Sequence, residues 1–262
     1  MPESAARLTA AQVRKAADIL FEARTHAARI RGLPADVTPV SMADASRIRD
    51  ELFRLLGGRC LGWFMGGTSR HSMVPMPYFA PILPAALYQS GAAFDHRSFF
   101  TFDVDLEIGF SFAKDVPAGT RIATAAEVLP FIDHVYPTLD VMNSQFEDPG
   151  SVGWPTIVAN NGTDGVVIRG SPTPVGSIED FATLKAVLAV NGSEVLSGSA
   201  SVVMGSPLEA VRWFICEMAR SQTIRKGSFL TTGSIVPVYR AQPGDVLTAA
   251  FTGLGAVTTR YL

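Results

Sequence analysis

Polar and apolar residues alternate without a break over residues 103–112, the clearest pattern in this chain. This period of two is that of a β-strand, and it places one set of side chains toward a core. That set is Val104, Leu106, Ile108, Phe110 and Phe112. The residues between them include Asp103, Asp105 and Glu107, which then share the opposite face. The segment therefore predicts a strand with one apolar and one acidic face.

Helical spacing replaces this alternation near the start of the chain. Thr9, with Gln12 three residues later, is a capping-box pattern, and apolar residues then recur every three or four positions. Ser41 begins a second segment of the same kind, which the pair Gly57-Gly58 ends. We expect two helices that form an N-terminal subdomain over residues 1–58.

Residues 59–262 have mostly the pattern of strands. The predicted strands cover residues 60–64, 135–141, 184–190, 194–199, 229–238 and 246–257. Asn191-Gly192 suits a type I′ turn between two of them, and Ser206 is expected to cap a further helix. The predicted fold class is α+β: a mixed, β-rich core with few helices, beside the helical N-terminal subdomain.

Two segments of this second region are predicted to be loops. Residues 74–87 contain several prolines, which lack the N–H that a central strand needs, so we expect an irregular loop that lines a site. Residues 142–165 are polar and rich in turn residues, and a loop of that length suggests a function or movement.

Composition excludes several classes of protein. A hydrophobic content of 47% with 18% charged residues favours a large folded core over disorder. A formal net charge of −2 argues against nucleic-acid binding. The N-terminus lacks the apolar run of a signal peptide, and no segment has the length of a membrane span. Cys60 and Cys216 stand outside any CxxC pattern. We therefore expect a cytoplasmic protein that binds neither nucleic acid nor membrane.

The acidic face of the predicted strand over 103–112 is a candidate metal site. Carboxylates held side by side repel one another unless water or a cation neutralises them. A hard divalent cation such as Mg²⁺ prefers oxygen ligands of this kind. The alternative is a solvent-exposed outer face of an antiparallel sheet, where acidic residues are common.

Several short segments together are similar to a known enzyme family. In chain order they are DLEI at 105–108, PTLDV at 137–141, VANNG at 158–162, GSP at 170–172, LSG at 196–198, GSPLEAV at 205–211, LTTGS at 230–234, PGD at 243–245 and GLG at 253–255. The chain thereby resembles the fumarylacetoacetate hydrolase superfamily, most of all its branch of 2-keto-4-pentenoate hydratases and 4-oxalocrotonate decarboxylases. The resemblance implies a roll or sandwich of strands that forms a catalytic domain over residues 59–262.

The resemblance also implies a divalent metal site. In that family two acids on one strand and a third further on hold the ion, and Asp105, Glu107 and Asp140 match them. The bound Mg²⁺ or Mn²⁺ chelates the carboxylate and adjacent oxo group of a 2-oxo acid and stabilises its enolate. The hydratases usually carry Glu at the first and third positions. Because Asp is one methylene shorter, we expect the ion to sit differently or to bind through water.

Three positions depart from the family pattern. Phe64 stands where a catalytic Lys is usual, Tyr78 where an acid is usual, and Gln145 where an Arg is usual. Neither Phe nor Gln can transfer a proton near neutral pH. The metal site is therefore expected to persist with altered acid–base chemistry, for a different reaction or a larger, more apolar substrate. Aromatic residues and methionines near Phe64 fit such a pocket, although they could equally fill a core.

Other residues are candidates for the chemistry. His71 titrates near neutrality and could replace the missing base, or it could be an exposed loop residue. Tyr78 could donate a hydrogen bond or act as an acid, and Asn161 could bind a substrate carboxylate; packing and an Asn-Asn-Gly turn are the alternatives. The remaining predicted substrate-binding residues are Phe64, Gly66, Phe79, Gln145, Asn160, Thr232, Gly233 and Ser234.

These observations predict a metal-dependent, hydratase-like lyase whose substrate is a small unsaturated 2-oxo or enol carboxylic acid of the kind formed in aromatic catabolism. Decarboxylation or C–C bond hydrolysis of the same substrate class is the enzymatic alternative. A repurposed family member that binds without the usual proton-transfer groups is the alternative from another class. The resemblance also implies a homo-oligomer.

Overall fold

The computed structural model describes residues 7–262. Its α-helices are α1 (Ala10–Thr25), α2 (Met42–Leu55), α3 (Trp154–Ala159) and α4 (Pro207–Met218). Its strands are β1 (Gly62–Gly66), β2 (Tyr78–Ile82), β3 (Leu87–Gln89), β4 (Ala93–Phe94), β5 (Asp103–Phe112), β6 (Ile132–Met142), β7 (Asp164–Arg169), β8 (Thr173–Pro174), β9 (Lys185–Val190), β10 (Ser193–Ser199), β11 (Phe229–Thr231), β12 (Tyr239–Arg240), β13 (Val246–Phe251) and β14 (Gly255–Tyr261). Short 3₁₀ turns, such as η3 (Ala125–Phe131) and η4 (Asn161–Thr163), connect them.

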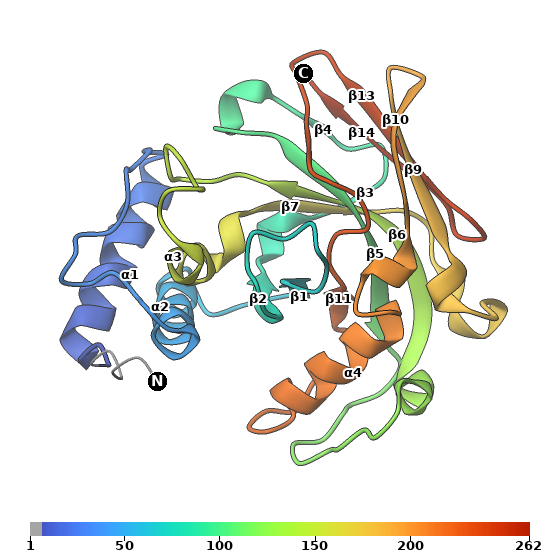
Figure 1. Cartoon of the computed structure of the whole chain (residues 1–262), viewed down its shortest axis with the longest axis horizontal. Coiled ribbons are helices and arrows are strands. Elements are labelled where there is room, and N and C mark those ends of the chain that lie inside the picture. Colours follow the sequence, from blue (N-terminus) through green and yellow to red (C-terminus); the bar gives the residue numbers. More distant parts are fainter. Residues whose placement is uncertain (1–6) are drawn as a thin grey trace.

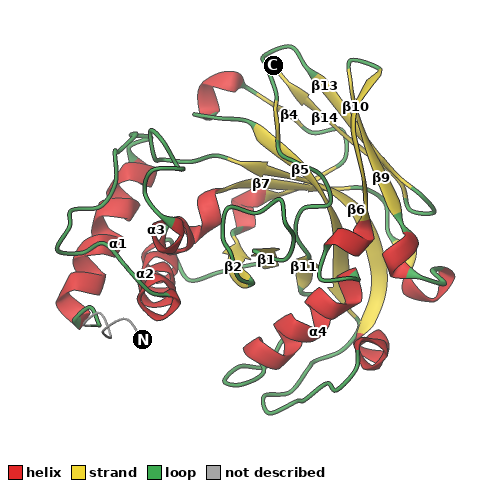
Figure 2. Ribbon diagram, viewed as in Figure 1, coloured by secondary structure: helices red, strands yellow, loops and turns green. Residues whose placement is uncertain are grey.

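The strands form two sheets (Figure 1). The larger has the order β2-β1-β11-β5-β6-β7-β3, with β12 paired to β5 and β8 to β6; the smaller has the order β10-β9-β13-β14-β4. The long strands β5 and β6 curve through the middle of the molecule (Figure 2). All five apolar side chains predicted to face inward from β5 are fully buried. The predicted α+β fold with a mixed, sheet-rich core is confirmed.

The N-terminal helices begin where the sequence predicted. Thr9 and Gln12 form a reciprocal capping box at α1, and the Ser41 hydroxyl caps α2. Helices α1, α2 and α3 lie together at one end of the larger sheet (Figure 1). Their apolar faces share one buried cluster with residues of β1 and β2, including Phe64 and Tyr78. The subdomain boundary at residue 58 remains a prediction.

The hairpin of the smaller sheet is confirmed. β9 and β10 flank Asn191 and Gly192, whose φ angles of 52° and 85° are those a type I′ turn requires at both central positions. Ser206 caps α4 as predicted. Within residues 7–262, no helix is both long enough and apolar enough to cross a membrane.

Four segments differ from the sequence predictions. The predicted strand over 246–257 is two strands, β13 and β14, which pair antiparallel across a turn at residues 252–254. Part of the proline-rich segment forms β2, because an edge strand that pairs only with β1 tolerates Pro81. The predicted loop over 142–165 contains α3, whose apolar residues pack on the N-terminal helices. The predicted strand over 229–238 is interrupted: β11 ends at Thr231 and the chain turns at Gly233, whose φ is 98°.

Candidate metal centre

Three carboxylates converge between the two longest strands. Asp105 and Glu107 are two residues apart on β5 and therefore share one face, and Asp140 on β6 pairs directly with Asp105. One oxygen from each side chain lies within 4.8 Å of the others. The three residues are only 6%, 2% and 9% exposed, respectively. Strand register alone thus brings together acids that are far apart in sequence.

Burial makes this cluster unfavourable without a cation. It raises the pKa of Asp105 to about 7, and the nearby Ser234 hydroxyl acts in the opposite direction. Burial also raises the pKa of Glu107 and of Asp140 well above their usual values, and the neighbouring carboxylates add to both shifts. The oxygen Oδ1 of Asp105 finds no hydrogen-bond partner within residues 7–262. A buried set of oxygen donors with one unsatisfied oxygen fits a hard divalent cation.

The solvent-exposed alternative for this strand face is wrong. Only Asp103, at the start of β5, is partly open, and its carboxylate accepts hydrogen bonds from Arg240 at 2.7 and 2.8 Å. Within the described residues, Asp105 and Glu107 have no such arginine; Glu107 Oε2 accepts a hydrogen bond from the Gly233 N–H at 2.9 Å. The two deeper acids are thus left for another positive charge.

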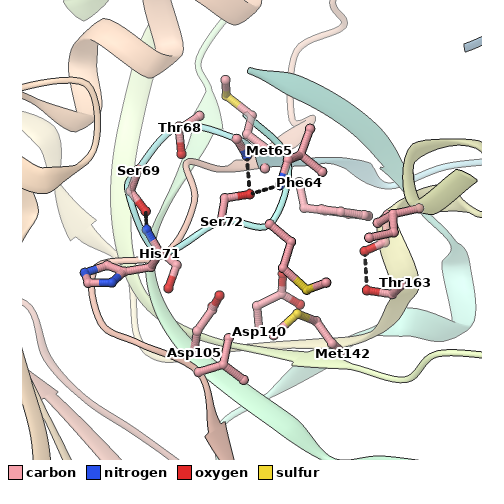
Figure 3. Close-up of a pocket in the computed structure, with 18 of the residues that line it drawn as sticks. Phe64, Met65, Thr68, Ser69, His71, Ser72, Asp105, Asp140, Met142 and Thr163 are labelled. Carbon is pink, nitrogen blue, oxygen red and sulfur yellow. Dashed lines mark hydrogen bonds between the residues drawn. The ribbon is translucent and has the colours of Figure 1, made fainter. Parts of the chain in front are cut away.

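A cavity of about 100 Å³, partly open to solvent, lies above the three carboxylates. Figure 3 shows Asp105 and Asp140 on one wall, facing the loop that carries Thr68, Ser69 and Ser72. The Ser72 hydroxyl oxygen accepts hydrogen bonds from the backbone N–H groups of Gly67 and Val74, which fixes the turn of this loop. Of the predicted site residues outside the acidic cluster, Phe64, Gly66, His71, Tyr78 and Ser234 line the cavity.

His71 lies at the edge of this cavity. Partial burial and the adjacent charge of Arg70 lower its pKa below the ordinary value, so the ring is neutral at pH 7. Figure 3 shows the ring directed away from Asp105 and Asp140. A neutral imidazole can accept a proton, but here the side chain must rotate to reach a molecule bound at the carboxylates.

Tyr78 is buried deeper in the same cavity. Its ring lies against Gly66, where an added Cβ would meet a ring carbon at 2.3 Å. Burial raises the pKa of the phenol far above 10, and the charges of Asp140, Glu107 and Asp105 add to the shift. The hydroxyl therefore stays protonated and can serve as a hydrogen-bond donor but not as a base.

Phe79 lies outside the cavity, contrary to expectation. Successive side chains of a strand point to opposite faces, so Tyr78 faces the cavity and Phe79 faces α4. There its ring packs edge-on against the rings of Phe214 and Trp213, with centroid-to-centroid distances of 5.2 Å and 6.3 Å, respectively.

Gln145, Asn160 and Asn161 are also not among the residues that line the cavity. Asn160 donates to Gln145 Oε1 at 2.9 Å and accepts from Arg24 Nε at 3.1 Å. Arg24 also bonds to Asp164, so these polar groups join α1 to the start of β7. The Asn161 amide donates to the Pro81 carbonyl at 3.1 Å and thereby holds β2. These groups connect segments of the chain, and their role in binding a substrate remains a prediction.

Thr232 and Gly233 support the acidic cluster from behind. The Thr232 hydroxyl donates to the Ile108 carbonyl at 3.0 Å, and the Thr232 carbonyl accepts from the Thr68 hydroxyl at 2.8 Å. Thr68, Ser72, Met142 and Thr163 also line the cavity and are not among the predicted site residues. The neighbouring Gly66-Gly67 pair was the signal that could have found the first two.

Replacing Gly233 with Ala is expected to lower the free energy of unfolding by about 1–3 kcal/mol and to weaken metal binding. An added Cβ would lie 1.9 Å from Thr68 Oγ1, and the φ of 98° disfavours any side chain. Displacement of the Gly233 N–H would then disturb Glu107. Chemical denaturation and titration calorimetry with Mn²⁺ measure the two effects.

Gly227→Ala is the matched control, because Gly227 also has a positive φ of 79° but has open space where a Cβ would lie. It should lose stability from backbone strain alone and bind the ion normally. Equal loss of ion affinity in both variants would contradict the role assigned to Gly233.

The metal-free protein is expected to lose stability as the pH rises. The Asp105 carboxyl has a pKa of about 7 when folded against 3.8 ordinarily, so the folded chain retains a proton that the unfolded chain releases. The associated stability is complete below about pH 4 and is lost by about pH 7, on the order of 4 kcal/mol. Glu107 and Asp140 shift in the same direction.

Thermal unfolding with a chelator or with saturating Mg²⁺, at about pH 5 and about pH 8, tests this pH dependence. The melting temperature with chelator should fall between the two pH values, and Mg²⁺ should raise it mainly at the higher one. An equal effect of Mg²⁺ at both pH values would contradict the expectation.

This sheet-rich α+β fold presents three buried carboxylates to a cavity, a set of oxygen ligands that suits a hard divalent cation. Comparison with family models identifies the particular family. The model of the fumarylacetoacetate (FAA) hydrolase C-terminal region matches residues 68–261, and the chain therefore belongs to the fumarylacetoacetate hydrolase family.

Relatives within this family include a hydratase and a decarboxylase. A 2-keto-4-pentenoate hydratase of Paraburkholderia xenovorans is 31% identical over 184 residues, which cover 65% of this chain and 67% of that protein. A 4-oxalocrotonate decarboxylase of Pseudomonas putida is 30% identical over 260 residues, 96% of this chain and 97% of that protein. The solved 4-oxalocrotonate decarboxylase of Pseudomonas putida G7, complexed with magnesium and adipate, matches with a TM-score of 0.89 and 26% identity, over 98% of this chain and all of that chain.

Proposed function

We propose that this chain is a metal-dependent hydro-lyase that uses Mg²⁺ or Mn²⁺ to add water to an unsaturated 2-oxo or enol carboxylic acid. The observation that carries the proposal is the cluster of three buried carboxylates at the base of an apolar-walled cavity. The family includes hydratases of such acids, and the similar decarboxylase structure contains magnesium.

Asp105, Glu107 and Asp140 would hold the cation. Their ionised oxygens supply the negative charge, and the Gly233 N–H orients Glu107. When bound, the cation would act as a Lewis acid that stabilises negative charge on the oxo oxygen of the substrate. The residues around it then bind and orient the rest of the molecule.

The cavity residues supply the remaining steps. His71, neutral at pH 7, would rotate inward, take a proton from the water whose oxygen bonds to one carbon of the double bond, and deliver a proton to the other carbon. The protonated Tyr78 hydroxyl would donate a hydrogen bond to a substrate oxygen. Phe64, which lines the cavity beside Asp140, would pack against the carbon chain and exclude water from that side. The Phe at this position means that proton transfer does not use the usual Lys.

The proposal is tested by turnover of 2-oxopent-4-enoate by the full chain, followed by loss of the absorbance of its conjugated enol. Activity should disappear with a chelator and return with Mg²⁺ or Mn²⁺, and the product should be the 4-hydroxy-2-oxo acid. Bound metal without turnover of any unsaturated 2-oxo acid would instead favour a family member that binds without catalysis.

Decarboxylation is the second candidate, because the 4-oxalocrotonate decarboxylase relative matches nearly the whole chain. Both reactions need negative charge to be stabilised next to the metal, so the carboxylate cluster suits either. Release of CO₂ from 4-oxalocrotonate, without net hydration of 2-oxopent-4-enoate, would replace the first candidate with the second.

A further inference from the structure

The cavity above the carboxylates has acidic residues at its base and uncharged residues on its other walls. Apart from its acidic base and the neutral His71, it is lined by hydroxyl-bearing and apolar residues, among them Met73, Val74, Met142, Ile157 and Val238. No Lys or Arg of the described chain, residues 7–262, is among the residues that line it. A ligand in this cavity therefore meets positive charge only at the metal.

The outer part of the cavity is mostly apolar, with the His71 ring at its edge. Met73 and Val238 line it and are 60% and 44% exposed, so they form its rim, whereas the carboxylates at its base are buried. If the 2-oxo acid end of a substrate lies at the metal, its carbon chain extends along the apolar wall toward this rim.

Arginines near this region form hydrogen bonds to groups outside the cavity or lie exposed beside it. Arg24 is bonded to Asp164 and Asn160, and Arg49 donates to the Phe79 carbonyl and to Asp50. Arg240 is bonded to Asp103. Arg70, beside His71, is exposed and is not a lining residue. The described arginines thus offer no preformed partner for a second anionic group inside the cavity.

We infer that the site selects 2-oxo acids that carry one carboxylate and an apolar tail, and that it discriminates against acids with a second carboxylate at the far end. This inference rests on the proposed function. A second carboxylate would lose water without gaining a cation, and it would enter a space whose base is already anionic. Each methylene buried against the apolar wall should instead increase affinity about fourfold.

The inference separates this chain from a similar protein. The 4-oxalocrotonate decarboxylase structure contains adipate, a dicarboxylate, and 4-oxalocrotonate itself carries two carboxylates. A site that rejects the second carboxylate favours hydration of a monoacid over decarboxylation of that diacid.

The test compares binding of two unreactive acids of equal length, 2-oxohexanoate and 2-oxoadipate, to the full chain saturated with Mg²⁺. Titration calorimetry should give at least about tenfold tighter binding for the monoacid. Equal or tighter binding of 2-oxoadipate would overturn the inference but leave the proposed function standing. Failure of both acids to bind in a metal-dependent way would overturn the proposed function and the inference together.

A second experiment uses variants that add a positively charged side chain at the rim of the cavity. Val238→Arg should tighten 2-oxoadipate binding about tenfold and leave 2-oxohexanoate unimproved, and Met73→Arg does the same from the loop side. Val246→Arg is the matched control, because Val246 is also exposed, at 41%, but lies on β13 outside the cavity. If neither rim variant changes the preference while both remain folded, the tail does not lie where we infer.

Discussion

The Asp105→Asn variant is expected to lose metal-dependent turnover by more than about 100-fold. It removes a charged metal ligand, and losing a ligand should reduce activity more than losing a group that only supports a ligand. The same change removes one of three repelling buried carboxylates. The metal-free variant should therefore unfold at a higher temperature than the metal-free parent above about pH 7. Loss of activity with a gain in metal-free stability is the combined signature of a cation site.

Asp103→Asn is the matched control for this variant. Asp103 lies on the same strand, two residues away, but bonds to Arg240 and is not among the cavity-lining residues. It should retain activity and metal affinity. Circular dichroism, calorimetric titration with Mn²⁺ and steady-state kinetics separate folding, ion binding and chemistry. Retained ion affinity in Asp105→Asn would exclude the carboxylate cluster as the metal site.

The His71→Gln variant is expected to lower kcat by about 10²- to 10⁴-fold while the affinity for Mn²⁺ stays unchanged. Gln has a comparable size but does not titrate. Because His71 must be neutral to accept a proton and its pKa is lowered, the activity of the parent should fall only at acidic pH, below about 6.5. With Mg²⁺ kept saturating at each pH, so that the carboxylates remain ionised, the variant should lose this acidic limb of the pH profile.

His26→Gln serves as the control for the loss of a histidine, since His26 follows α1, is exposed and bonds only to the neighbouring turn. It should match the parent at every pH. Full activity of His71→Gln, with an unchanged pH profile, would assign proton transfer to another group of the cavity.

Local patterns predicted much of the fold. Alternation over β5 gave the correct buried face, and the Thr9, Ser41 and Ser206 caps marked helix starts because these side chains bond to nearby N–H groups. The position of α3 was missed, since its polar flanks resemble a loop and its stability comes from packing on α1 and α2.

Predicting the candidate site required knowing which residues far apart in the sequence lie together in the fold. The spacing of Asp105 and Glu107 was visible in the sequence, but Asp140 came from the family resemblance, because register between β5 and β6 has no local signal. Phe79 was misplaced because β2 was not predicted, and without a strand the alternation with Tyr78 was unknown. Asn160 bonds to Gln145 and also to Arg24, a residue of α1 that is far from both in sequence, so no local pattern predicts this arrangement.

The direct pairing of Asp105 with Asp140 has a consequence for how this chain matures. A slip of one residue between β5 and β6 would turn one of the two acids to the opposite side of the sheet and destroy the cluster. A newly synthesised chain would therefore bind the proposed ion only after these central strands have aligned correctly. A bound ion would then stabilise the correct register of the two strands. The availability of the ion during synthesis should therefore govern the yield of correctly folded protein.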